Sequence, residues 1–284
     1  MSSFESMCDF RFFRVPCKQI TKESLIEWLD DENTKRFNLE FNQRYAIRQL
    51  ETGNSYGKIV TPFLEPVETI LSRYLNIEPF LFQSSFSQGG YRFIKTEEEY
   101  ELIFAKLQEI KSLVFLRDNL DLSIALSMHE SAPGERTQIG QDVYEAKYNG
   151  NMTGLPRLTA ALQSTLDKLP YFKDVDMVCC IPTQHPILQQ IVSNLKGFSF
   201  SDISSSVVWT NKNDEIKGKT SEKKLELLEQ FGLQIGIDVK EKTILLLDDM
   251  YQSGLTIQFV AMKLKEAGAK RVFGITLVKA LGNE

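Results

Sequence analysis

The spacing of apolar residues changes near residue 110 of this 284-residue chain. Beyond that point, short apolar runs alternate with stretches in which apolar residues recur every three or four positions, and these patterns predict strands and helices respectively. The predicted strands are SLVFL, DLSIALSMH, VDMVCCIP, SSVVW, KTILLLDD and RVFGITLVKA, and the predicted helices are GLPRLTAALQSTLDKL, ILQQIVSNLKG, LELLEQFG and IQFVAMKLKEAGA. Such alternation is typical of an α/β fold, a parallel sheet with helices on both faces.

The first 110 residues have a different pattern of apolar residues, which predicts mainly helices. Thr21 can cap a helix that contains Leu25, residues 39–50 carry a weaker helical pattern, and TEEEYELIFAKLQEI is a clear amphipathic helix. We therefore predict a helix-rich N-terminal accessory region over 1–110 and an α/β domain over 111–284.

Composition narrows the class of protein. Hydrophobic residues make up 42% and charged residues 25%, as in ordinary globular proteins, and the net charge of −5 gives no indication of nucleic-acid binding. No apolar run reaches the roughly 20 residues that span a bilayer, and the N-terminus lacks the pattern of a secretion signal, so we expect a cytoplasmic protein without a membrane partner. The cysteines are Cys8, Cys17, Cys179 and Cys180, whose spacing fits neither a disulfide framework nor a zinc site, and we expect Cys179 and Cys180 to be buried thiols. The adjacent Cys179 and Cys180 should point to opposite faces of a strand.

One corner of the predicted sheet carries candidate chemistry. In ILLLDDMYQSGLTI, residues 244–257, an apolar strand ends in two acids and passes through a small-residue turn into a helix. Ligands of open parallel sheets sit beyond the carboxyl ends of the strands, and a helix N-terminus with nearby hydroxyl groups can hold a phosphate. Gly254 lets the backbone approach that phosphate closely. Asp248 and Asp249 would repel a phosphate but suit a sugar diol, or a metal that the ligand brings, so the corner fits a sugar 5-phosphate.

ILLLDDMYQSGLT closely resembles the signature of type I phosphoribosyltransferases, and the resemblance covers roughly residues 112–284. AKYNGN, VCCIPTQHP and LKGFSF look like the arrangement in the ComF-like group of that family. The resemblance implies a parallel-sheet phosphoribosyltransferase fold. It also implies an enzyme, a pentosyltransferase that uses phosphoribosyl pyrophosphate (PRPP) with substrate-bound Mg²⁺ and passes ribosyl phosphate to a nucleobase-like acceptor.

The same resemblance implies roles for residues. Asp248 and Asp249 would act in catalysis by orienting the ribose hydroxyls, and the turn after VCCIP would contact pyrophosphate. Lys147 would line the site, and residues 210–224 would form a hood loop that offers Lys219. The residues expected to bind substrate are Gln252, Ser253, Gly254, Leu255, Thr256, Thr183, Gln184, His185, Lys147 and Lys219.

Three departures from the family pattern keep another function open. Gln252 stands where purine-salvage members place an acid, the 183–186 turn has no Lys or Arg, and the zinc-binding segment of ComF-like proteins is missing. The alternative is a non-catalytic module that senses PRPP or a nucleotide, or a defence-type effector that targets nucleotides. Residues 1–110 would cover the site, form a homodimer contact or recruit a partner, which for the sensor would be a protein or a nucleic acid.

Other interpretations compete for the individual motifs. Acids after an apolar strand also occur in ATPases, and NDEIKGKT at 213–220 partly matches a phosphate-binding loop, although Asn213 replaces its first glycine. The two acids could serve only a structural turn at a helix N-terminus. His185 could be a solvated side chain, Lys147 could pack beside Tyr148, and residues 210–224 could be a plain polar loop. His129 is expected to be structural.

Overall fold

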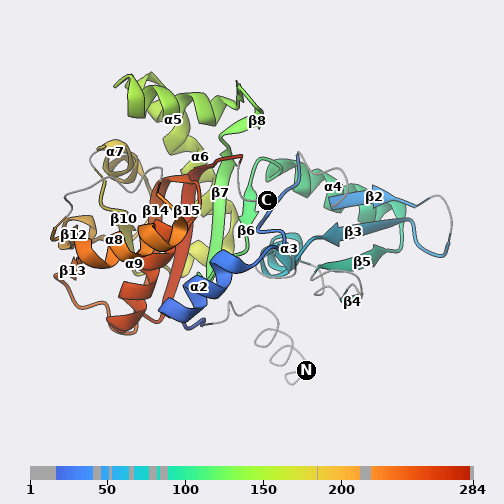
Figure 1. Ribbon diagram of the computed structural model, residues 1–284. Helices are drawn as coiled ribbons and strands as arrows, with labels where there is room; N and C mark the ends of the chain where they lie inside the picture. Colours follow the sequence, from blue (N-terminus) through green and yellow to red (C-terminus); the bar gives the residue numbers. More distant parts are fainter. Residues whose placement is uncertain are drawn as a thin grey trace.

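The computed structural model of the chain describes residues 17–40, 46–50, 53–63, 67–76, 82–83, 89–183, 185–211 and 219–281. Its centre is a seven-stranded, mostly parallel sheet in the order β1-β6-β7-β15-β14-β10-β11 (Figure 1). The strands are β1 (Arg36–Asn38), β6 (Val114–Leu116), β7 (Leu122–Met128), β15 (Arg271–Lys279), β14 (Thr243–Tyr251), β10 (Met177–Cys180) and β11 (Ser201–Asp202). Neighbouring strands from β7 to β11 run parallel, while β1 and β6 are antiparallel additions. A mixed α/β fold is thereby confirmed.

Helices cover both faces of this sheet. On one face lie α5 (Gln138–Tyr148), α6 (Leu155–Lys168) and α7 (Ile187–Asn194), which pack against strand residues such as Leu245 and Leu247. On the other face lie α2 (Lys22–Asp30), α8 (Ser221–Phe231) and α9 (Leu255–Glu266), packed against Ile244 and Leu246. The strands are apolar on both sides because both sides are covered, which explains their continuous hydrophobic runs.

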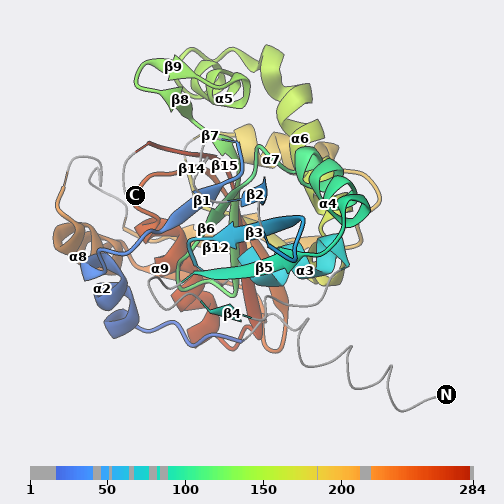
Figure 2. The ribbon, with the colours of Figure 1, turned by 90° about the vertical axis from the view of Figure 1, so that its right-hand side faces the viewer.

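The N-terminal region contains more strand than its sequence predicts. A second, antiparallel sheet has the order β2-β3-β5-β4. Its strands are β2 (Ala46–Gln49), β3 (Gly57–Thr61), β5 (Gly90–Ile94) and β4 (Phe82–Gln83), and beside it lie α3 (Val67–Leu75) and α4 (Glu97–Glu109) (Figure 2). The helical pattern predicted for 39–50 is wrong over 46–49, because Ile47 pairs with Ile59 across the ladder and tertiary pairing overrides the weak local pattern.

The boundary drawn at residue 110 is crossed by the main sheet. β1 is its edge strand and pairs with β6, and Ile59 and Ile94 of the second sheet belong to the same buried cluster as Leu245 of β14. Residues 1–110 and 111–284 as separate folding units therefore stay a prediction. The remaining short elements are β8 (Glu130–Ala132), β9 (Glu135–Arg136), β12 (Val207–Trp209), β13 (Leu233–Ile235) and the 3₁₀ turns Met152–Gly154, Pro170–Asp174 and Ser204–Ser206.

Cys179 and Cys180 lie on opposite faces of β10, as predicted, and both are buried. Burial raises the pKa of the Cys179 thiol and raises that of Cys180 to about 12. We expect iodoacetamide at pH 8 to alkylate both at least about 100-fold more slowly than the exposed Cys17, because the thiolate fraction of Cys180 is then on the order of 10⁻⁴. Peptide mass spectrometry of the native protein measures this, and equal rates at the three thiols would contradict it.

Candidate functional site

The corner between β14 and α9 has the geometry of an anion-binding turn. β14 ends at Tyr251, residues 252–254 form the turn, and α9 begins at Leu255. The N-cap position is Gly254, which has no side chain, so the first N–H groups of α9 receive no capping oxygen from that position. Ser253 and Thr256 are half-buried and Gln252 is exposed. Backbone donors, two hydroxyl groups and the positive end of the helix dipole thus meet at one point.

Gly254 is required at this corner for two separate reasons. Its φ of +70° lies in the left-handed region, which L side chains adopt at a cost. A Cβ atom at this position would lie 2.1 Å from Cζ and 2.2 Å from Oη of Tyr251. The turn therefore rests directly on the Tyr251 ring.

The two acids at the strand end have different surroundings. Asp248 is half-buried, and its Oδ1 accepts a hydrogen bond of 2.9 Å from the backbone N–H of Asp249. Asp249 is only 5% exposed, and its Oδ2 lies 2.7 Å from Nζ of Lys147 in the last turn of α5. Burial opposes the charge of Lys147, yet attraction to Asp249 and their hydrogen bond raise its pKa overall. Asp249 therefore carries its own counter-ion in this structure.

Both acids lie where β14 loses its regular two-residue alternation. Leu247 and Met250 pack on the face covered by α5, α6 and α7, whereas Leu246 and Tyr251 pack on the α9 face. A regular strand would put residues three apart on opposite faces. The irregularity falls between Leu247 and Met250, at Asp248 and Asp249.

The acidic strand end lies at the switch point of the sheet. β10 connects through α7 to β11 on one side, while β14 connects through α9 to β15 on the other, and the two helices cover opposite faces. The carboxyl ends of β10 and β14 therefore border the crevice in which open α/β sheets bind ligands. Figure 1 shows α5 above these strand ends.

The 183–186 turn begins beside the acids. The N–H of Ile181 donates to the carbonyl of Leu247 at 2.8 Å, which places the end of β10 next to Asp248. Thr183 and His185 are half-buried, and the backbone N–H of His185 donates to Oγ1 of Thr183 at 3.2 Å. Gln184 lies outside the described residues. The structure thus brings this turn, the acids and the 252–256 turn to one edge of the sheet.

The hood loop predicted over 210–224 is only partly described. Residues 212–218 lie outside the described ranges, and from Ser221 onward the chain forms α8 rather than loop. Thr220 caps this helix by accepting a hydrogen bond from the N–H of Lys223. Lys219 is exposed at the start of α8. Its contact with a substrate stays a prediction.

Lys279 also lies at this site, although it is not among the residues that the sequence predicts to bind substrate. It ends β15, is 1% exposed, and its Nζ donates to the carbonyl oxygens of Ala280 at 2.7 Å and Gln252 at 3.5 Å. A lysine buried at the end of an apolar strand was the available signal. Next to it, the N–H of His129 donates to the carbonyl of Lys279 at 2.8 Å. Burial lowers the pKa of His129, and its Nε2 has no hydrogen-bond partner within the described ranges.

No second candidate site is found elsewhere among the described residues. A hollow of about 230 Å³ lies between α2 and α8, and none of the predicted site residues lines it. Across the described ranges, no group of three His, Cys, Asp or Glu side chains is arranged to hold a metal ion. In the same part of the chain, the helices are all too short or too polar to cross a lipid bilayer.

Comparison with protein-family models finds no match, and comparison with curated proteins finds none either. Among solved structures, a hypoxanthine phosphoribosyltransferase from Staphylococcus aureus is 14% identical with a TM-score of 0.30, covering 44% of this chain and 62% of its own. A hypoxanthine-guanine-xanthine phosphoribosyltransferase is 14% identical with a TM-score of 0.27, covering 51% and 66%. A hypoxanthine-guanine phosphoribosyltransferase from Bacillus anthracis is 11% identical with a TM-score of 0.28, covering 46% and 68%. The chain thus spans less than two thirds of the first, and these values are too low to assign a function.

Proposed function

We propose that the chain is a phosphoribosyltransferase-like enzyme that binds PRPP at the β14–α9 corner and transfers ribosyl phosphate to a nucleobase-like acceptor. The observation that carries the proposal is the meeting of two acids and an uncapped helix N-terminus at the switch point of the sheet. Few ligands need both hydrogen-bond acceptors for hydroxyl groups and amide donors for a phosphate within one turn, and a phosphorylated pentose is one of them.

The 5-phosphate would occupy the turn of residues 252–256. The backbone N–H groups at the start of α9 and the hydroxyls of Ser253 and Thr256 supply its donors. Gly254 lets this turn lie directly against the Tyr251 ring. Lys279 lies behind the turn on the carbonyl of Gln252 and adds positive charge near the anion.

The ribose and pyrophosphate would extend from this turn toward β10. Asp248, the more exposed acid, would accept hydrogen bonds from the ribose hydroxyls. Thr183 and His185 would contact the pyrophosphate from the neighbouring strand end. The 183–186 turn has no cation for the pyrophosphate, and Lys147 would supply one. Its Nζ is paired with Asp249 at the carboxyl end of β14.

In the proposed reaction the bond between C1 of the ribose and the pyrophosphate oxygen breaks, and that oxygen leaves with the electron pair. An acceptor nitrogen forms the new bond to C1 and loses its proton to the departing pyrophosphate or to water. The carboxylates face the positive charge that develops on the ribose, while cations and amides face the leaving group. Mg²⁺ would arrive with the substrate and neutralise pyrophosphate. The two carboxylates fit this role, because Asp248 is the less buried of the two and Asp249 is paired with Lys147.

Calorimetry and a pyrophosphate assay test this proposal. PRPP and ribose 5-phosphate should both bind in the presence of Mg²⁺, and one of the common nucleobases should trigger pyrophosphate release. Asp248→Asn should reduce PRPP turnover on the order of 100-fold, by analogy with the loss of one group that stabilises transition-state charge. Asp167→Asn, at an exposed position on α6, is the matched control and should change nothing. If neither PRPP nor ribose 5-phosphate binds, the proposed function is excluded.

A specific observation keeps a second candidate, a non-catalytic PRPP or nucleotide sensor. Gln252 presents an amide where purine-salvage members carry an acid, so this position offers no carboxylate base to the acceptor. PRPP binding without pyrophosphate release, together with a co-purifying protein, would favour the sensor. A cytoplasmic location and a homodimer stay predictions.

A further inference from the structure

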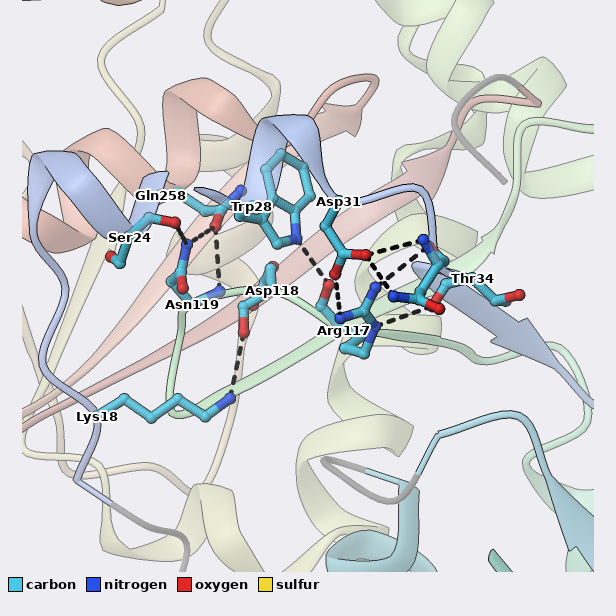
Figure 3. Close-up of polar contacts among 10 residues, drawn as sticks. Lys18, Ser24, Trp28, Asp31, Thr34, Arg117, Asp118, Asn119 and Gln258 are labelled. Carbon is cyan, nitrogen blue, oxygen red and sulfur yellow. Dashed lines mark hydrogen bonds and ion pairs between the residues drawn. The ribbon is translucent and has the colours of Figure 1, made fainter. Parts of the chain in front are cut away.

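The loop of residues 117–121 bonds both to the N-terminal segment of residues 17–34 and to Gln258 of α9 (Figure 3). That helix follows the turn of residues 252–256 proposed to hold phosphate, termed the phosphate corner. On the N-terminal side, Nε1 of Trp28 donates to the carbonyl of Arg117 at 2.9 Å, and Arg117 forms a 2.6 Å ion pair with Asp31. Nζ of Lys18 donates to the carbonyl of Asp118 at 3.2 Å. The loop is therefore fixed to residues 17–34 at several points.

Asn119 joins this segment to the first turn of α9. Its Nδ2 donates to the carbonyl of Ser24 at 3.2 Å and to Oε1 of Gln258 at 2.9 Å. Its backbone N–H donates to the same Oε1 at 3.1 Å. Gln258 is completely buried, and its own N–H donates to the carbonyl of Gly254 at 3.1 Å. Two hydrogen-bonded residues thus separate α2 from the turn proposed to hold phosphate.

Asp118 makes a second connection, to the floor of the corner. Its Oδ2 accepts a hydrogen bond of 3.1 Å from the hydroxyl of Tyr251, and both groups are buried. Its Oδ1 accepts a hydrogen bond of 3.0 Å from the N–H of Leu120, which fixes the orientation of the carboxyl group. Because the Gly254 backbone lies against the Tyr251 ring, the position of that ring determines the position of the turn.

We propose that Tyr251 and Gln258 are positioning residues of the phosphate corner and that Asp118 and Asn119 couple them to α2. The N-terminal segment would then belong to the site rather than only covering the sheet. The coupling is reciprocal. A partner that binds α2 and shifts it changes ligand affinity at the corner, and ligand binding changes the affinity for that partner by the same factor. The ligand named here rests on the proposed function, whereas the coupling itself does not.

The test compares three conservative variants of the full chain. Tyr251→Phe keeps the ring and removes the bond to Asp118, and Trp28→Phe removes the bond to Arg117 far from the corner. Tyr171→Phe is the matched control, because Tyr171 is equally buried but packs on the other face of the sheet. Hydrogen exchange is measured at the amide of Gln258 without ligand, and ribose 5-phosphate affinity is measured by calorimetry.

We expect Tyr251→Phe and Trp28→Phe to speed exchange at Gln258 about fivefold and to weaken ribose 5-phosphate by a similar factor, as loss of one hydrogen bond predicts. Tyr171→Phe should leave ribose 5-phosphate affinity unchanged. Its exchange rate at Gln258 should change only as much as the change in its global stability predicts. If exchange at Gln258 in the two variants matches that in Tyr171→Phe, the coupling is wrong. Failure of the unmutated protein to bind ribose 5-phosphate or PRPP would exclude the proposed function, while the exchange comparison would still decide the coupling.

Discussion

Replacing Gly254 with alanine is expected to weaken ligand binding at the corner strongly and to destabilise the protein. The new Cβ would lie 2.1 Å from Tyr251 Cζ, at a φ of +70°. The left-handed conformation and the steric overlap together should lower the free energy of unfolding by roughly 2–5 kcal/mol. Because the turn must move, PRPP affinity should fall on the order of 100-fold through lost backbone hydrogen bonds to the phosphate. Urea unfolding and calorimetry measure the two effects.

Gly197 provides the matched control for this substitution. It also has a positive φ, +81°, but nothing lies within 4 Å of the position of its missing Cβ. Gly197→Ala should therefore cost only the conformational strain, about 1–2 kcal/mol, and leave PRPP affinity unchanged. Equal effects of the two substitutions would mean that the contact with Tyr251 does not constrain the corner.

Replacing Lys147 with methionine is expected to weaken both the fold and PRPP binding. It leaves the nearly buried Asp249 without its partner at 2.7 Å, and because Lys147 is partly exposed we expect a loss of about 1–3 kcal/mol of unfolding free energy. The proposed site also loses a cation, so PRPP affinity should fall about tenfold or more. Because the pKa of Lys147 is raised in the fold, this stabilisation is present below about pH 10.4 and is lost at higher pH.

A double-mutant cycle separates the charge effect from general damage. Asp249→Asn combined with Lys147→Met removes both charges, so it should recover much of the stability lost in Lys147→Met while binding stays weak. Lys168→Met is the control, because its ion pair with Glu109 spans 3.5 Å and is exposed, and it should cost less than about 1 kcal/mol. Additive stability changes in the cycle would show that the buried pair does not stabilise the fold.

The hydrophobic pattern identified most of the main sheet because its signals are local. The run ILLL predicts β14, and the spacing of Ile257, Val260 and Leu264 predicts α9. The acids and the glycine turn between them follow directly, so this part of the candidate site could be predicted from the sequence. The placement of Cys179 and Cys180 on opposite faces follows from strand geometry alone.

Several parts that sequence reasoning missed depend on distant residues, whereas α5 has a local N-cap at Thr137 and was missed all the same. β2 is a strand because of its pairing with β3, and no local pattern announces that pairing. Tyr251 and Asp118 are 133 positions apart, and Lys147 and Asp249 are 102 positions apart by number, so their contacts exist only once the sheet has formed. Only the fold shows that the Asp249 carboxylate already has a cation.

The position of β15 constrains how the chain assembles on the ribosome. β15 is synthesised after β7 and β14, yet it lies between them and pairs with both. Until residues 271–279 emerge, two apolar strands each lack their central neighbour and present an open edge to other nascent chains. We expect translation-arrested chains that stop before residue 271 to be cut rapidly by protease within both strands, and chains that include residues 271–279 to be protected there.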